Sequence, residues 1–231
     1  MKKLFLSGIS GLMLVMVSLT AFAQESRSFS VSGFSKLEMG SAFKVDVKQG
    51  NKYSVTTTGR SEDLKDLEAN VSGGTLKLGY KDKNWGKNRK TVIVSITMPA
   101  LQGVDFSGAS KVNVERFSGV KTMDIEVSGA SQVTMDLAAT RVSMDLSGAS
   151  QLLLTGQCDV LNGEVSGASS FKGKDFPAKE VNIDASGASS ASVAASNSIH
   201  AEASGASSIR YSGSAQNIHS SSSGASSVKR Q

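Results

Sequence analysis

The chain has 231 residues, a net charge of +5 at neutral pH and one cysteine, Cys158. A single cysteine excludes an intrachain disulfide, and 25 basic residues against 20 acidic ones lack the basic density of a nucleic-acid-binding protein, so we expect no nucleic-acid partner. The length allows one large all-β domain or two small domains.

The N-terminus has the pattern of a secretory signal peptide. Lys2 and Lys3 precede an apolar run that starts at Leu4, and "AFA" then supplies small residues before a cut ahead of Gln24. We assign residues 1–23 to this peptide and expect an exported protein, located in the periplasm, in the cell envelope or outside the cell. No second apolar run is long enough to cross a bilayer as a helix, so no transmembrane segment is expected after cleavage.

Residues 24–106 are expected to form an irregular β section. The segments "FSKLEMGSAFKVDVKQG", "GTLKLGY" and "TVIVSITMP" alternate apolar and polar residues, as strands with one buried face do. Between the first two, "SEDLKDLEA" predicts a short helix near residues 61–69, capped by Ser61, with Leu64 and Leu67 on one face.

A polar, basic loop, "KDKNWGKNRK", separates the last two of these strands and contains the only tryptophan. Trp85 can stack on a sugar ring, and Lys87 and Arg89 can contact acidic groups of a glycan. We treat these three residues as a candidate ligand-binding site, with an ordinary surface loop as the alternative.

Seven copies of Ser-Gly-Ala-Ser recur through residues 107–231. Around each copy, apolar residues alternate with polar ones, as in "DIEVSGASQVTMDL", which is typical of strands. A repeat of about 20 residues without a helical pattern predicts a solenoid of short strands. The copies begin at Ser107, Ser128, Ser147, Ser166, Ser186, Ser204 and Ser223.

We therefore predict an all-β fold, a right-handed parallel β-helix with coils of about 20 residues, regular over 107–231. A sandwich or barrel of antiparallel hairpins is the main alternative. Hairpins should show turn pairs such as Asn-Gly every 8–12 residues or so, whereas glycine here recurs at one fixed position of the repeat.

The tetrapeptide is interpreted as a corner of the coil. Glycine permits backbone conformations closed to other residues, and its alanine is expected to fill a cramped inside corner. Each serine can bond to nearby backbone groups or to its copy in the next coil. The alternative is that the serines form a flat, exposed array that binds a partner.

Six carboxylates occupy one repeat position, two residues before each of the first six tetrapeptides. Both neighbours of each are expected to point inward, so the six should form an outward column with backbones about 4.8 Å apart. Unit charges that close repel by about 0.9 kcal/mol in bulk water. Splayed, hydrated side chains or bound Ca²⁺ would relieve this repulsion. The residues are Asp105, Glu126, Asp145, Glu164, Asp184 and Glu202.

The residues expected to point inward become smaller along the chain, from Phe106 and Leu146 to Ala203 and Ser222. The last coils should therefore bury less apolar area and be the least stable. They should also leave an exposed strand edge, through which two copies of the chain can form a homo-oligomer.

The chain resembles the head GIN-domain proteins, a family labelled as auto-transporter adhesins. The resemblance rests on "VSGFSKLEMGSAFKVDVKQGNKYSV", "GTLKLGY" and "VSITMPALQGVDFSGAS", in this order and followed by repeated "SGAS", and it covers most of the mature chain. It implies an exported β-helical protein with an adhesin-like role.

These observations favour a non-enzymatic, adhesin-like protein that binds a glycan or a surface protein along one face of the β-helix. The alternative is a carbohydrate-active enzyme of the polysaccharide lyase or hydrolase type, since such enzymes also use β-helices. We expect no catalytic residues and no cofactor apart from Ca²⁺ at the acidic column. Cys158 is expected to be a buried apolar residue, because an exported lone cysteine without a nearby histidine is unsuited to nucleophilic catalysis.

Overall fold

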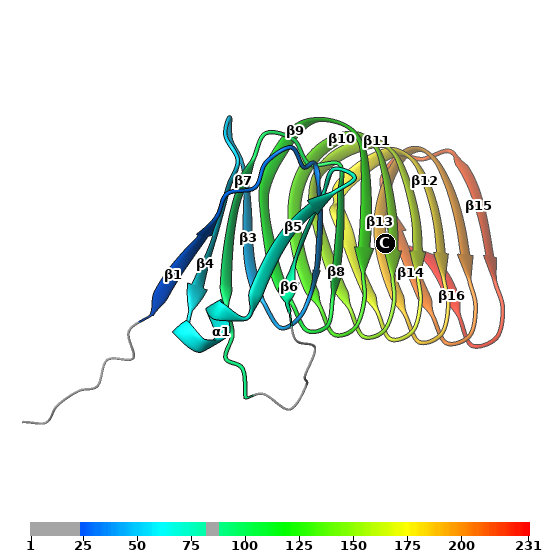
Figure 1. The fold of residues 1–231 in the computed structure, drawn as a ribbon. Coiled ribbons are helices and arrows are strands. Elements are labelled where there is room, and N and C mark those ends of the chain that lie inside the picture. The colour runs from blue at the N-terminus through cyan, green and yellow to red at the C-terminus, as the bar shows by residue number, and fades with distance from the viewer. Residues whose placement is uncertain (1–23, 82–87) are drawn as a thin grey trace, which may run out of the picture.

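The computed structural model describes residues 24–81 and 88–231, and the expected signal peptide lies outside this part of the chain. Within the described residues, sixteen strands form one continuous hydrogen-bonded sheet. The sheet is wound into a parallel β-solenoid whose coils follow one another from left to right in Figure 1. The all-β solenoid predicted from the repeat is therefore confirmed.

The regular coils consist of long, bent strands that pair in parallel with their copies one repeat later. For example, Gln132–Leu146 pairs with Gln151–Val165 without any register shift. The strands are β9 (Lys111–Val127), β10 (Gln132–Leu146), β11 (Gln151–Val165), β12 (Ser170–Ala185), β13 (Ser190–Ala203), β14 (Ser208–Ser212), β15 (Asn217–Ser222) and β16 (Ser227–Arg230).

Each tetrapeptide forms a corner that stacks on the corner of the preceding coil. Its glycine has a φ between +68° and +77°, a region that disfavours side chains. The amide of Ala149 donates to the carbonyl of Gly129 at 2.7 Å, and the same bond recurs at every corner after the first. A Cβ atom on Gly148 would lie 2.6 Å from that carbonyl oxygen, so both the φ angle and the close approach require glycine.

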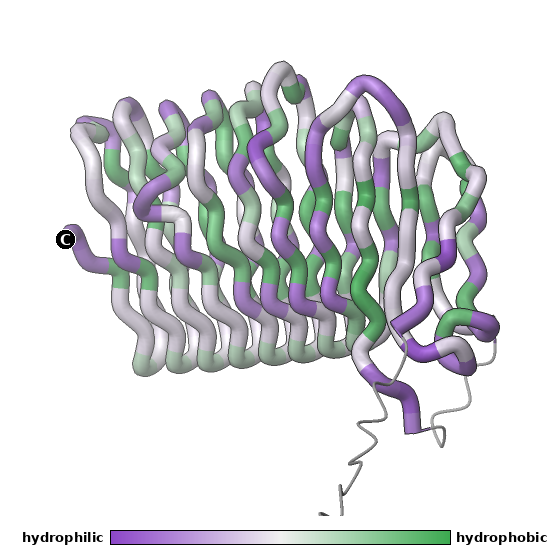
Figure 2. The backbone as a smooth tube through the Cα atoms, turned by 90° about the vertical axis from the view of Figure 1, so that its left-hand side faces the viewer, coloured by the Kyte–Doolittle hydropathy of each residue, from purple (hydrophilic) through white to green (hydrophobic). Residues whose placement is uncertain are grey.

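The coils differ in length, and the corner opposite the tetrapeptide accommodates the difference. Register shifts fall between Met135 and Ala139 where β10 pairs with β9, and between Gly173 and Glu180 where β12 pairs with β13. Figure 2 accordingly shows an even row of pale turns along one edge of the solenoid and an uneven row along the other.

The alanine of the tetrapeptide is exposed, so the prediction that it fills the inside corner is wrong. The fourth residue, a serine, takes that place and is buried in the first six copies. In several copies its hydroxyl bonds to a backbone carbonyl of the preceding coil, as Ser189 donates to Val165 at 2.9 Å and Ser207 to Ala185 at 2.9 Å. A methyl group could not satisfy these buried acceptors.

The N-terminal coils are stacked in a different order from their order in the chain. The first coil, β2 (Lys36–Gly40) and β3 (Lys44–Gln49), lies between two later segments, and every contact is parallel. On one side it pairs with β6 (Thr75–Tyr80) and β7 (Ile93–Met98). On the other it pairs with β8 (Gly103–Ser107) and the start of β9.

Antiparallel strands cover the N-terminal end of the solenoid. β4 (Ser54–Gly59) pairs with β7, β1 (Glu25–Phe29) pairs with β4, and β5 (Leu67–Ser72) pairs with β6. Because these strands run against the parallel coils, the stack cannot continue in this direction with the same pattern.

The helix, α1 (Ser61–Lys65), is shorter than the expected 61–69. It ends there because Leu67 begins β5, where its side chain is fully buried. The expected cap is also wrong, since Arg60 holds the N-cap position and no side chain caps the helix. Arg60 instead donates to Asp63 at 2.7 Å.

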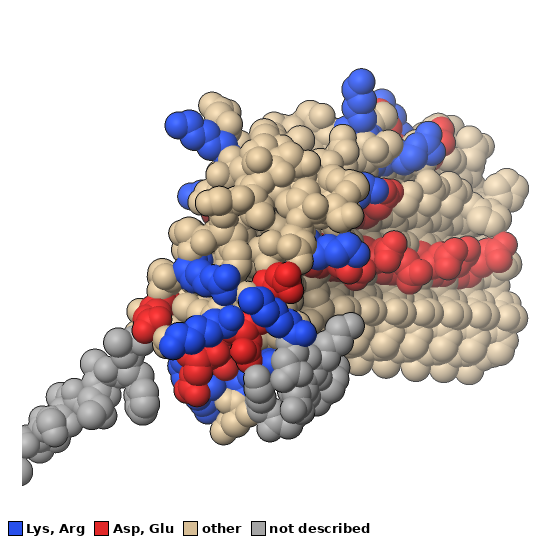
Figure 3. Space-filling model, viewed as in Figure 1, with Lys and Arg blue, Asp and Glu red and all other residues tan. Residues whose placement is uncertain are grey.

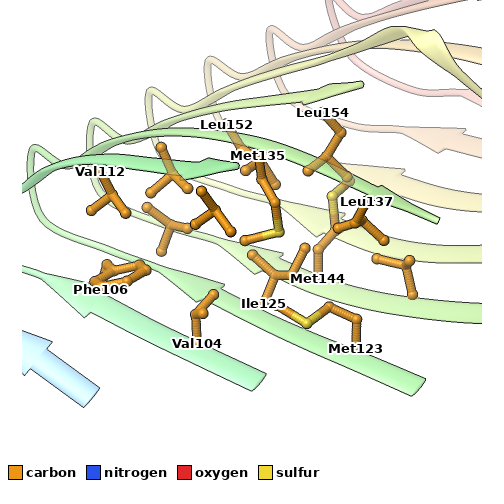
Figure 4. Packing of buried hydrophobic residues seen from close by; sticks show 14 of the residues in the cluster. Val104, Phe106, Val112, Met123, Ile125, Met135, Leu137, Met144, Leu152 and Leu154 are labelled. Atoms are coloured by element: carbon orange, nitrogen blue, oxygen red, sulfur yellow. The ribbon is translucent and has the colours of Figure 1, made fainter. Parts of the chain in front are cut away.

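The core fills the inside of the coils, where residues at one repeat position stack on one another (Figure 4). Where one coil has a small residue in the core, larger side chains of the neighbouring coils fill the space. A Cβ atom on Gly163 would lie 2.4 Å from Met144 and 2.7 Å from Ile183, whose side chains occupy that space. Towards the C-terminus the core thins out, and every residue of β15 is exposed.

Replacing the corner glycine Gly148 by alanine should destabilise the fold by more than about 1 kcal/mol, because strain at positive φ adds to a clash with backbone. Gly119 has a φ of +73° but open space around it, and Gly79 has neither constraint. Urea unfolding of the three single alanine variants should rank the loss as Gly148, then Gly119, then Gly79. Equal stability of the first two would show that stacking of the corner is unimportant.

Hydrogen exchange should be fastest in β15 and β16, because these strands bury little apolar surface and Ile218 is 36% exposed. Amides of β10 and β11 should be the most protected, as both strands pair on two sides. If two copies associate through the C-terminal edge, protection of β15 and β16 should rise with protein concentration. Uniform protection of all four strands in a dilute monomer would contradict the gradient.

Candidate functional site

The acidic column lies on the outer face of the sheet, beside the tetrapeptide corner. Strand pairing places its six predicted members opposite one another in successive coils. Figure 3 shows the column as a continuous red stripe along the solenoid. The six residues that the sequence indicated are therefore brought together by the fold.

A seventh carboxylate, Glu38, extends the column at its N-terminal end, because β2 pairs with β8 and sets Glu38 opposite Asp105. Sequence reasoning missed it because the first coil carries Gly-Ser-Ala instead of Ser-Gly-Ala-Ser. Aligning Met39 with Phe106, both buried, would have revealed it. Lys77, on the next strand outward, forms an ion pair with Glu38 and closes this end of the column.

A second line of polar residues runs parallel to the acidic column, and the two enclose a shallow groove of about 380 Å³. Asn182 donates to Asn162 at 2.9 Å in this line. His200 lies 3.1 Å from a carboxylate oxygen of Glu202, and its ring centroid is 6.4 Å from that of His219 in the next coil. All of these groups are accessible to water.

Asp105 is only partly exposed to water. Burial raises its pKa, the carboxylates of Glu126 and Glu38 raise it further, and Lys77 lowers it. The ionised form of Asp105 is therefore disfavoured in the folded protein, mainly because the carboxyl is partly buried and in addition because like charges stack beside it.

The column does not by itself form a chelating site. Across residues 24–81 and 88–231, no three histidine, cysteine, aspartate or glutamate side chains are grouped so that they could hold a metal ion. Adjacent carboxylates in a single line offer too few ligands at one point for Ca²⁺, which takes six to eight oxygens or so. Calcium binding by the column stays a prediction.

On the other side of the tetrapeptide corner, the outer face carries a second groove of about 250 Å³, which we call the lysine groove. Lys44, Lys111 and Lys172 contribute ammonium groups to it, and Gln132 and Gln151 contribute amides. Sequence reasoning missed this groove, because Lys44 belongs to a coil that lacks the tetrapeptide.

The tryptophan loop is only partly described, since Trp85 and Lys87 lie outside the described residues. Arg89 is placed at the N-terminal end of the solenoid, away from the regular coils. Its guanidinium stacks 3.7 Å from the ring centroid of Tyr80 and lies 3.5 Å from a carboxylate oxygen of Asp66. These contacts hold the segment against β6, and ligand binding by the loop stays a prediction.

Cys158 is buried at the corner opposite the tetrapeptide, as expected. Burial, with a smaller contribution from Asp159, raises the pKa of its thiol to about 12. The thiol therefore stays protonated at neutral pH and is unsuited to act as a nucleophile. Separately, no helix among the described residues is long and apolar enough to cross a membrane.

Residues 33–215 match the family model described as "Putative auto-transporter adhesin, head GIN domain". The chain belongs to this family. The resemblance seen in its strand segments and tetrapeptides is thus confirmed over most of the chain. No curated protein matches the sequence.

Solved structures from Bacteroides and Parabacteroides species have the same fold. A "putative adhesin" from Bacteroides fragilis superimposes with a TM-score of 0.84 at 22% identity, covering 90% of this chain and 97% of that one. A "putative lipid binding protein" from Parabacteroides distasonis gives 0.67 at 20% identity, covering 90% and 96%. A "putative adhesin" from the same species gives 0.72 at 16% identity, covering 91% and 98%. At these identities, the likeness concerns the fold.

Replacing Asp105 by asparagine should raise the melting temperature at pH 7 in the absence of divalent cations, because it removes a carboxylate whose pKa is raised by folding. For such a group, the relative stabilisation is complete below the unfolded pKa near 4 and is lost as pH rises through the higher folded value. The gain should therefore shrink as the pH is lowered towards 4. Asp145→Asn, in the same column but exposed, serves as the control with a smaller gain.

The same melting series tests calcium binding. If the column holds Ca²⁺, chelation lowers the melting temperature of the unmodified protein, and Asp105→Asn reduces the difference between calcium and chelator. Identical melting in calcium and in chelator would remove the calcium prediction. A lower melting temperature of Asp105→Asn at pH 7 without calcium would contradict the repulsion argument.

Proposed function

We propose that this protein is an exported, non-enzymatic, adhesin-like protein that binds a glycan or a surface protein along an outer face of its solenoid. Membership of the head GIN-domain family supports the adhesin-like role. The alternative, a carbohydrate-active enzyme, is an outcome of the test described below.

The observation that carries the proposal is the arrangement of exposed polar groups in straight columns. Successive coils present equivalent side chains about 4.8 Å apart, so a face of the solenoid is a long, rigid and periodic surface. The seven carboxylates from Glu38 to Glu202 and the lysine groove lie on two such faces. An extended polymer or a strand of another protein can make the same contact repeatedly along such a surface.

The placement of the carboxylates and of His200 among the described residues supports binding over hydrolysis on these faces. Polysaccharide hydrolysis uses paired carboxylates, one of which is kept protonated as an acid. The pKa of Asp105 is raised, but its carboxylate neighbours Glu38 and Glu126 belong to the same line on the outer face, one in each adjacent coil. His200 is accessible, but its partner Glu202 stands beside it on the surface and not across a cleft.

The test is to incubate the chain lacking residues 1–23 with immobilised polysaccharides, bacterial surface proteins and lipid vesicles, and to measure both binding and soluble products. Vesicles are included because a structural neighbour is described as lipid-binding. We expect saturable retention on at least one polysaccharide or protein, without release of oligosaccharides. Release of oligosaccharides would support the enzyme, and absence of binding throughout the panel would refute the proposal.

A further inference from the structure

We infer that the lysine groove is a binding site for an acidic polysaccharide whose chain runs along the solenoid axis, across β3, β9, β10, β11 and β12. This inference rests on the proposed function and names the surface and the ligand class that serve it. The groove lies on a different face of the solenoid from the acidic column, and its charge has the opposite sign. It contains both cationic and neutral hydrogen-bonding groups.

The shape of the groove follows from side-chain length at two repeat positions. Directly after each corner, Lys111, Gln132 and Gln151 stack on one another in successive coils and form one wall. Two residues further along, the shorter Asn113 and Thr134 form the floor. Because the coils are in register here, the hollow continues from one coil to the next.

The lysines of the groove are free to form ion pairs with a ligand. The ammonium groups of Lys44, Lys111 and Lys172 are exposed, and none forms an ion pair with another described residue. By contrast, Lys36, Lys77 and Lys179 elsewhere on the surface each lie within 3.2 Å of a carboxylate oxygen. One carboxylate, Asp46, lines the groove, so its net charge is positive.

The order of the groups along the axis favours a polymer of acidic sugars over other anions. Lys44 and Lys111 stand in adjacent coils at one end, and Lys172 stands three coils beyond Lys111 at the other. The amides of Gln132 and Gln151 lie between them, where they can donate to and accept from hydroxyl groups. Leu153, half-buried in the same face, offers an apolar contact for the carbon atoms of a sugar ring.

The acidic column restricts the ligand to this face. An anionic chain that crossed the tetrapeptide corner would meet the carboxylates of Asp145 and Glu164, which repel it. The exposed serines, glycines and alanines of the corner itself carry no charge. The polymer is therefore expected to follow the groove lengthwise and not to wrap around the coils.

The experiment compares three variants of the chain lacking residues 1–23 with the unmodified protein. The groove variant is Lys44→Gln with Lys111→Gln and Lys172→Gln. The matched control is Lys65→Gln with Lys81→Gln and Lys121→Gln, which changes the net charge equally at exposed sites outside the groove. The amide variant is Gln132→Ala with Gln151→Ala, which leaves the charge unchanged. Thermal melting verifies that each variant folds.

Binding is measured by biolayer interferometry to alginate, polygalacturonate and chondroitin sulfate, with dextran as the neutral polymer and double-stranded DNA as an anion without sugar carboxylates. We expect binding to at least one acidic polysaccharide that weakens as salt rises. The groove variant should lose about 10-fold in affinity, since three exposed ion pairs are removed. The matched control should bind like the unmodified protein. The amide variant should bind more weakly with an unchanged salt dependence.

Several results would overturn the inference. These are equal losses in the groove variant and its matched control, equal binding of DNA and acidic polysaccharides, or stronger binding of dextran than of any acidic polymer. If the unmodified protein binds a polysaccharide or protein and the groove variant binds it equally well, the inference fails while the proposed function stands. If the unmodified protein binds nothing in either panel, the proposed function itself fails.

Discussion

The fold depends on the stacking of one backbone corner on its own copies. At each Ser-Gly-Ala-Ser after the first, the amide after the glycine donates to the glycine carbonyl of the preceding coil, as from Ala149 to Gly129. A Cβ atom would collide with that carbonyl, so no side chain can be placed there. Because this corner cannot shift, every residue near it is held in register, and the differences in coil length move to the opposite corner.

The same constraint creates the surface chemistry. Residues close to the corner must stand directly above their copies, so one repeat position becomes one column. Carboxylates from Asp105 to Glu202 are thereby set in line although like charges at about 4.8 Å repel one another. The backbone ladder and the stacked core outweigh this cost. The repulsion predicts that, without bound cations, the fold would be more stable with fewer charges at this repeat position.

Much of this structure could be predicted from the sequence, because a repeated pattern imposes a repeated structure. The solenoid, the alternation of buried and exposed residues and six members of the acidic column all follow from local sequence. The order of the N-terminal coils does not, since Met39 stacks on Phe106 through pairing between distant segments. The prediction that alanine fills the inside of the corner was also wrong. Ala and Ser are both small, and only the buried carbonyls, which need a hydroxyl donor, favour serine at this place.

The lysine groove shows why the candidate site was harder to predict than the fold. Its members occupy two repeat positions and five strands, and no repeat position carries lysine in every coil. Alignment of the repeats alone would separate Lys44 from Lys111, because the coil that contains Lys44 is displaced in the chain and lacks the tetrapeptide. Only the spatial order of the coils places these two lysines side by side. In a solenoid, the residues that all repeats share determine the fold. Recognition of a particular ligand depends instead on the residues by which individual coils differ from the repeat.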